Sequence, residues 1–143
     1  MKMMSKWFKL DEFLHSDVAL KNRIKNYPTW EDVENLKKLA LLLDKIREKL
    51  GMSITITSGF RSLALNKKIG GSATSQHRKG EAADCECKDN KKLFDTVKEM
   101  IDDGEIEVGQ LIWEYGTKKQ PEWVHISIPD GKHKNEILYI GVK

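Results

Sequence analysis

A long amphipathic segment, followed at once by a short alternating one, is the feature that most limits the folds open to this chain. Between Thr29 and Gly51 the apolar residues recur at three-and-four spacing, which predicts a helix with one apolar stripe. Thr29 is a good N-cap and Gly51 a typical helix stop. Residues 53–58 then alternate polar and apolar, which predicts a strand. The stripe consists of Leu36, Leu39, Leu43, Ile46 and Leu50.

The remaining segments predict a mixture of helices and strands without regular alternation. Short helices are expected over residues 62–69 and 91–103, the first closed by Gly70-Gly71 and the second stopped by Gly104. Strands are expected at 82–88, 110–115, 123–128 and 137–142. This order favours an α+β domain with a largely antiparallel sheet. A chain of 143 residues fits one domain, so we expect residues 1–143 to form one unit with a flexible stretch at residues 1–7.

Four polar residues have the types and spacing of a hydrolytic zinc site. His77, Asp84 and His125 could ligate one metal, and three protein ligands leave a fourth tetrahedral position for water. His77 is expected in a loop rich in Gly and Ser, whereas His125 is expected on a strand, on the same face as Trp123. Glu122 lies near the start of that strand, where a bend after Pro121 could bring its carboxylate to the metal as a base.

Other residues with metal-binding or aromatic side chains admit several interpretations. Cys85 and Cys87 are too close for an unstrained disulfide, so they are expected as free thiols that are buried like small apolar residues. A rival zinc site that uses them with His77 is conceivable, but no second ligand pair has finger-like spacing. His15 and His133 are interpreted as surface residues. Glu114 is a candidate acceptor for the second nitrogen of a ligand histidine, and the aromatic residues Trp113, Tyr115 and Trp123 suit either the core or a substrate wall.

Composition and charge argue against a nucleic-acid-binding, membrane-spanning or secreted protein. The net charge is +3 and the lysines are spread along the chain, so no nucleic-acid-binding surface is expected. The longest apolar run, residues 39–43, is far shorter than the roughly twenty residues that span a membrane. The first nine residues lack the apolar core and cleavage site of a signal peptide. We therefore expect a protein that is made in the cytoplasm and does not insert into membranes.

Several separate motifs together resemble the zinc D-Ala-D-Ala carboxypeptidase family, the peptidoglycan peptidases that share the fold of the hedgehog signalling domain. These motifs are Ser58-Gly59-Phe60-Arg61, with Phe60 where Tyr is commoner, then Asn66, Gly70-Gly71, the stretch from His77 to Asp84, and Glu122-x-x-His125. An N-terminal stretch resembles the branch common in phage and prophage lysis proteins: Phe8 to Phe13, Ser16, Ala19, Asn26 and Pro28. The resemblance covers about residues 8–128 and implies the hedgehog/DD-peptidase-like α+β fold.

The resemblance implies a role for each matching residue. His77, Asp84 and His125 would ligate Zn²⁺, and Glu122 would be the general base and acid. Arg61 would bind the substrate carbonyl and stabilise the oxyanion, a role that suits a rigid, always charged guanidinium. Ser75 would hydrogen-bond the substrate backbone. Trp123, which shares a face with His125, is a further candidate for substrate contact.

The implied function is hydrolysis of a stem peptide of bacterial peptidoglycan by a monomeric zinc metallopeptidase. D-Ala-D-Ala carboxypeptidase activity is the first expectation, and an L-Ala-D-Glu endopeptidase of the endolysin type is the alternative. Two further hypotheses propose no enzyme. One is a non-hydrolytic wall-binding module with a structural zinc, and the other is a metal-free globular protein. Without a signal peptide, the enzyme would reach the wall by lysis, through a holin-like lesion, or in a phage particle.

Overall fold

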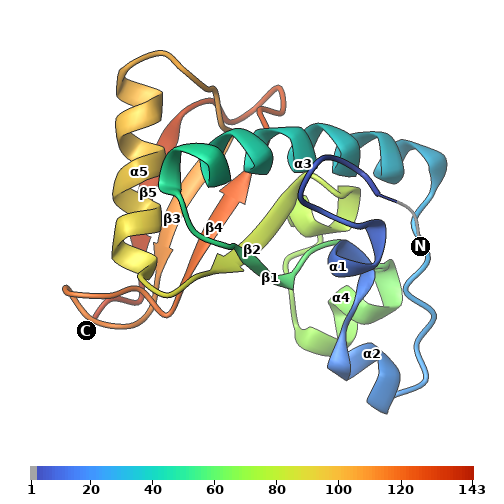
Figure 1. Cartoon of the computed structure of the whole chain (residues 1–143). Helices are drawn as coiled ribbons and strands as arrows, with labels where there is room; N and C mark the ends of the chain where they lie inside the picture. Colours follow the sequence, from blue (N-terminus) through green and yellow to red (C-terminus); the bar gives the residue numbers. More distant parts are fainter. Residues whose placement is uncertain (1–2) are drawn as a thin grey trace.

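The chain folds around a five-stranded mixed sheet, as seen in a computed structural model that describes residues 3–143 (Figure 1). Three of the four strand pairings are antiparallel, and only the last, between β3 and β5, is parallel. The predicted α+β class with a largely antiparallel sheet is therefore confirmed. In spatial order the strands are β1 (Thr55–Ser58), β2 (Ala82–Glu86), β4 (Trp123–Ser127), β3 (Gln110–Glu114) and β5 (Glu136–Ile140).

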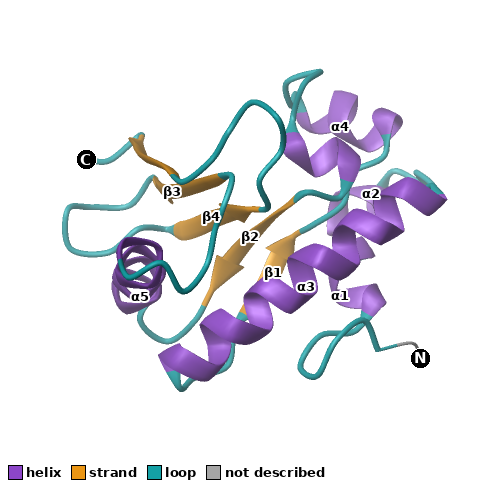
Figure 2. Ribbon diagram, turned by 90° about the horizontal axis from the view of Figure 1, so that it is seen from above, coloured by secondary structure: helices purple, strands orange, loops and turns teal. Residues whose placement is uncertain are grey.

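Helices surround this sheet unevenly. The short helices α1, α2 and α4 gather at the β1 end of the sheet, whereas α5 lies beside β3 and β5, and α3 runs across the molecule between the two groups (Figures 1 and 2). A 3₁₀ helix, η1, replaces the loop that was predicted around His77. The helices are α1 (Leu10–Leu14), α2 (Asp17–Lys21), α3 (Trp30–Leu50), α4 (Leu63–Ile69), η1 (Gln76–Lys79) and α5 (Asn90–Asp102).

The long helix α3 begins and ends where its sequence predicts. Thr29 accepts a hydrogen bond from the Asp32 amide, and the Asp32 carboxylate accepts one from the Thr29 amide, so the two residues form a capping box. Gly51 ends the helix in the left-handed conformation, with φ of 76°. The predicted stripe from Leu36 to Leu50 is buried along its whole length. Each of these five side chains contributes roughly 1.5–3 kcal/mol through its burial.

One face of the sheet forms the hydrophobic core, and the other presents polar side chains. Residues of one face pack against α3 and α5 and form the hydrophobic core. They alternate along the strands with residues that point to the opposite face, because successive strand residues face opposite ways. The core face therefore fixes the register in which the other face presents its polar side chains. The strand residues on the core face are Ala83, Cys85, Leu111, Trp113, Val124 and Ile126, all buried.

The N-terminal segment is held against α3 by hydrogen bonds to one carboxylate. The Asp44 carboxylate accepts hydrogen bonds from the Ser5 hydroxyl and from the backbone amides of Lys6 and Trp7. Residues 1–2 lie outside the described part, so a flexible stretch at residues 1–7 stays a prediction. Among residues 3–143, no helix combines the length and the apolar character needed to cross a membrane.

Gly59 lets the backbone of α1 approach the turn after β1. The Phe60 amide donates to the Phe13 carbonyl oxygen at 2.7 Å, and a methyl group at position 59 would lie 2.5 Å from that same oxygen. We expect G59A to lower the free energy of unfolding by about 1–3 kcal/mol, because backbone rather than a flexible side chain must shift. Urea denaturation would measure the loss.

The matched control is G131A, since a methyl group at position 131 would meet nothing within 4 Å. This variant is expected to stay within about 0.5 kcal/mol of the parent protein. Equal stabilities for the two variants would contradict the close approach of α1.

Candidate metal centre

Neighbouring strands place Asp84 and His125 directly opposite each other. Asp84 of β2 pairs with His125 of β4 in the antiparallel register, and both side chains are on the face that α3 and α5 do not cover. Both residues are buried. Two rigid central strands thus fix two candidate ligands from parts of the chain that are 41 residues apart.

His77 reaches the same point from η1. The Ser75 hydroxyl caps this short helix by accepting a hydrogen bond from the His77 amide. Gly80 ends it with φ of 73°, where a methyl group would lie 2.6 Å from the Asp32 carbonyl oxygen of α3. The sequence pattern Ser-x-His-x-x-Gly therefore has a local reason: a cap, a ligand and a stop that lets η1 pack tightly on α3.

The three side chains converge closely. One ligand atom from each of His77, Asp84 and His125 lies within 4.8 Å of the other two. Asp84 Oδ1 is 3.4 Å from His77 Nε2 and 3.2 Å from His125 Nδ1. Burial acts to raise the pKa of Asp84, but the two neighbouring histidines hold this pKa well below its usual range. Asp84 is therefore a carboxylate in this cluster.

Hydrogen bonds on the far side of each ring assign the histidine protons. His77 Nδ1 lies 2.8 Å from the Gly59 carbonyl oxygen, which can only accept, so Nδ1 carries the proton. His125 Nε2 lies 2.9 Å from Gln76 Oε1 and likewise donates. In the neutral rings, His77 Nε2 and His125 Nδ1 therefore present lone pairs to Asp84.

This donor set fits a zinc ion. Three groups that can only accept stay together in a buried place when a cation or a proton lies between them, because their lone pairs repel. Two imidazole nitrogens and one carboxylate oxygen are ligands that zinc takes, and a set of three leaves one position open. The second nitrogen of each histidine is held by the protein, as is usual for metal ligands.

Arg61 lies beside this cluster. Its Nη2 is 3.8 Å from Asp84 Oδ2, its Nε donates to the Ser58 hydroxyl, and its side chain is only 15% exposed. The backbone is fixed as well, since the Arg61 amide donates to the His77 carbonyl oxygen. Asn26 is buried and bonds both to the Phe60 carbonyl oxygen and to the Ser62 amide, so it clamps the turn on either side of Arg61.

The acidic residue that faces the cluster is Glu114. It is on β3 opposite Trp123, on the same face as His125, and its Oε1 is 3.8 Å from His125 Nδ1. Its Oε2 accepts a hydrogen bond from Trp123 Nε1 at 2.9 Å. Burial and the neighbouring Asp84 carboxylate raise the pKa of Glu114 above its ordinary value.

Glu122 is placed differently. Its side chain is exposed, and its described hydrogen bonds are made by its backbone: the amide donates to the Glu114 carbonyl oxygen, and its carbonyl oxygen accepts from Asn90 Nδ2. The residue precedes β4, and Trp123 is the first residue of the strand. Among residues 3–143, Glu114 therefore makes the described carboxylate contact with His125 from β3, and the assignment of Glu122 as the base stays a prediction.

The remaining candidates lie around the cluster or away from it. Ser75 caps η1, and Trp123 is half-buried between Glu114 and the Tyr115 ring, 5.2 Å away. Cys85 faces the core, where burial raises the pKa of its thiol, and within residues 3–143 the metal-ligand cluster contains no cysteine. His15 and His133 each lie beside a carboxylate, Asp17 and Glu136 respectively, outside the cluster.

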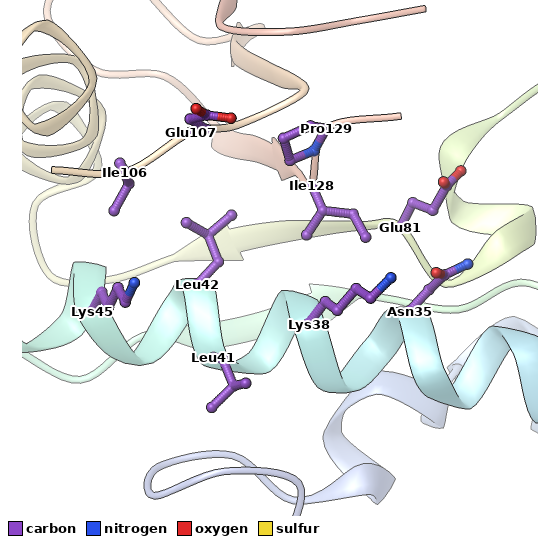
Figure 3. Close-up of a pocket in the computed structure, with 10 residues that line it drawn as sticks. All are labelled: Asn35, Lys38, Leu41, Leu42, Lys45, Glu81, Ile106, Glu107, Ile128 and Pro129. Atoms are coloured by element: carbon purple, nitrogen blue, oxygen red, sulfur yellow. The ribbon is translucent and has the colours of Figure 1, made fainter. Parts of the chain in front are cut away.

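The hollow drawn in Figure 3 is separate from the three ligands. It measures about 460 Å³ and lies between α3 and the segments that carry Ile106 and Ile128. Leu42 and the stems of Lys38 and Lys45 form its floor along α3, whereas the Leu41 side chain projects to the other side of the helix. No candidate ligand lines this hollow, so it does not belong to the metal centre.

A comparison with protein families gives a match over most of the chain. Residues 6–127, which include all three candidate ligands, Arg61 and both glutamates, match the sequence model of the family described as Peptidase M15. No curated protein sequence matches the chain.

Proposed function

The chain belongs to the peptidase M15 family of zinc-dependent metallopeptidases, and we propose that it hydrolyses peptide bonds in the stem peptides of bacterial peptidoglycan. The observation that carries the proposal is the buried convergence of His77 Nε2, Asp84 Oδ1 and His125 Nδ1, with a carboxylate and a guanidinium at its side. A structural zinc site would need a fourth protein ligand, whereas three ligands suit catalysis.

The chemistry divides between the ion and the side chains. His77, Asp84 and His125 would hold a zinc ion, which polarises the scissile carbonyl and lowers the pKa of water. Glu114 takes the proton of the attacking water and returns it to the leaving amine, a role that requires a carboxylate beside the metal.

Glu122 is the rival base, since it matches the Glu-x-x-His motif in the sequence. The contacts favour Glu114, because its carboxylate lies 3.8 Å from His125 Nδ1, whereas the Glu122 side chain is exposed. Either carboxylate would do the same chemistry. The choice between them changes which substitution abolishes turnover.

Arg61 stabilises the negative charge that develops on the carbonyl oxygen. Its guanidinium is nearly buried and is held by Ser58 and Asp84, so little reorganisation is needed when charge appears. Ser75 and Trp123 are proposed to contact the substrate backbone and an adjoining side chain. Trp123 also fixes the Glu114 carboxylate through its indole N–H.

We propose the terminal D-Ala-D-Ala bond as the bond that is cut, which makes the enzyme a carboxypeptidase. Such a substrate carries a free carboxylate, and Arg78 offers a second guanidinium, held by a hydrogen bond from its Nη1 to the Arg61 carbonyl oxygen. The alternative bond, L-Ala-D-Glu, is internal and needs no such partner. The enzyme would act as a monomer on the wall after release or delivery from the cytoplasm.

The test is digestion of purified muropeptides by the zinc-loaded protein, with the products weighed by mass spectrometry. Release of D-alanine alone is expected. Separation of L-alanine, which stays attached to the sugar, from a stem peptide that begins with D-Glu would instead identify the endopeptidase. A protein that binds one zinc ion but cleaves neither bond would favour a wall-binding module.

A further inference from the structure

We propose that Asp130 and Gln76 form a hydrogen-bonded relay that sets the tautomer of His125, and thereby decides whether the His125 nitrogen facing the metal position can bind a metal. Both are positioning residues that act through His125. The inference rests on the proposed zinc site, but not on which peptide bond is cut.

Gln76 connects two groups that are distant in the sequence. Its Oε1 lies 2.9 Å from His125 Nε2, and its Nε2 donates to Asp130 Oδ2 at 3.1 Å. Gln76 is only 8% exposed, so water does not readily replace either bond. A glutamine amide can face either way, and its orientation follows from its partners.

Asp130 removes that ambiguity. Its carboxylate can only accept, so the Gln76 group that faces it must be the NH₂. Its other oxygen, Oδ1, accepts from the backbone amides of Lys132 and His133 at 2.9 and 2.7 Å, which anchors the carboxylate. Although burial acts to raise it, these donated hydrogen bonds hold the pKa of Asp130 below its ordinary value. Asp130 therefore stays ionised and keeps Gln76 in one orientation.

The orientation has a consequence at the metal position. With Gln76 Oε1 facing His125, the ring must carry its proton on Nε2, and Nδ1 is left with a lone pair that faces Asp84. With the amide reversed, Nε2 would have to accept, and the proton would move to Nδ1. A protonated Nδ1 cannot bind a metal until that proton is displaced.

The substitution D130N tests the relay with almost no change in shape. The two backbone amides still require an oxygen at Oδ1, so the new NH₂ must face Gln76. Two NH₂ groups cannot bond, so Gln76 is expected to reverse and to move the His125 proton to Nδ1. We expect zinc affinity, measured by competition with a chromogenic chelator, to fall by about 10–100-fold. Nitrogen-15 NMR of the metal-free imidazole should show the proton on Nδ1.

Two further variants distinguish control of the His125 tautomer from a purely structural role of Asp130. In the double variant D130N/Q76E, the carboxylate introduced at position 76 can accept from both position 130 and His125 Nε2, so zinc affinity should recover to within about threefold of the parent protein. D130A does not force a reversal and should lose less affinity than D130N. Unchanged affinity in D130N, or a loss that D130N/Q76E does not restore, would overturn the relay. A parent protein without zinc affinity would instead overturn the proposed function.

Discussion

Replacing Glu114 by Gln is expected to lower kcat for stem-peptide cleavage by about 10²–10⁴-fold, the contribution of a general base. The amide fills the same space and still accepts the hydrogen bond from Trp123 Nε1, but it cannot take a proton from water. None of the three ligands is changed, so the variant should bind about one zinc ion, as the parent protein does. Steady-state assays on muropeptides, with zinc measured by elemental analysis, provide both numbers.

The matched control is E122Q, the same change at the glutamate that the sequence motif favours. Because the Glu122 side chain is exposed, we expect kcat within about twofold of the parent value. The opposite pattern, a collapse in E122Q with E114Q active, would return the base role to Glu122. Loss of zinc from E114Q would mean that Glu114 supports the ligands rather than the proton transfer.

Removing zinc is expected to lower the melting temperature of the protein by about 10–20 °C. A ligand present at a thousand times its dissociation constant stabilises the folded state by about 4 kcal/mol, which for a chain of this size is a shift of that order. The buried cluster makes the effect large, because without the ion three accepting atoms remain within 4.8 Å of one another. Scanning calorimetry with zinc and with a chelator would measure it.

D84N is the control for this second experiment. The amide nearly preserves the shape of Asp84 but removes the charge, so the melting temperature of this variant should not respond to zinc. A parent protein that melts at the same temperature with zinc and with chelator would contradict a zinc ion held by these residues. A response in D84N equal to that of the parent would show that zinc acts elsewhere on the chain.

The sequence predicted those parts of the fold that depend on local rules. Helix α3 has a capping box at Thr29 and a left-handed glycine at its end, so its bounds could be read from residue types alone. The helix predicted over residues 91–103 begins and ends one residue earlier, because the Asp89 side chain caps it by accepting a hydrogen bond from the Lys92 amide. The strand predicted at residues 53–58 is shorter, since β1 begins only at Thr55.

The role of Glu114 beside the candidate metal site could not be predicted from local sequence rules. The three ligands were predicted from residue types and spacing, and the structure brings them together. Glu114 was predicted only as an acceptor for a ligand histidine, because its proximity to His125 follows from the register of β3 against β4. No local rule gives a cross-strand register, and none connects Gln76 with Asp130 across 54 residues.

Along the central strands, successive side chains face alternately the hydrophobic core and the candidate metal site. Substitutions at neighbouring positions are therefore expected to have different effects. On β4, a substitution at Val124 or Ile126 reaches the core beneath α3 and α5 and would reduce the amount of folded protein in a cell. One at Trp123 reaches the opposite face and would leave abundant protein of low turnover, whereas one at His125 would also remove the stabilisation that a bound zinc ion gives. A map of mutational tolerance along this strand would therefore show loss of abundance alone at the core positions, loss of turnover alone at Trp123, and both losses at His125.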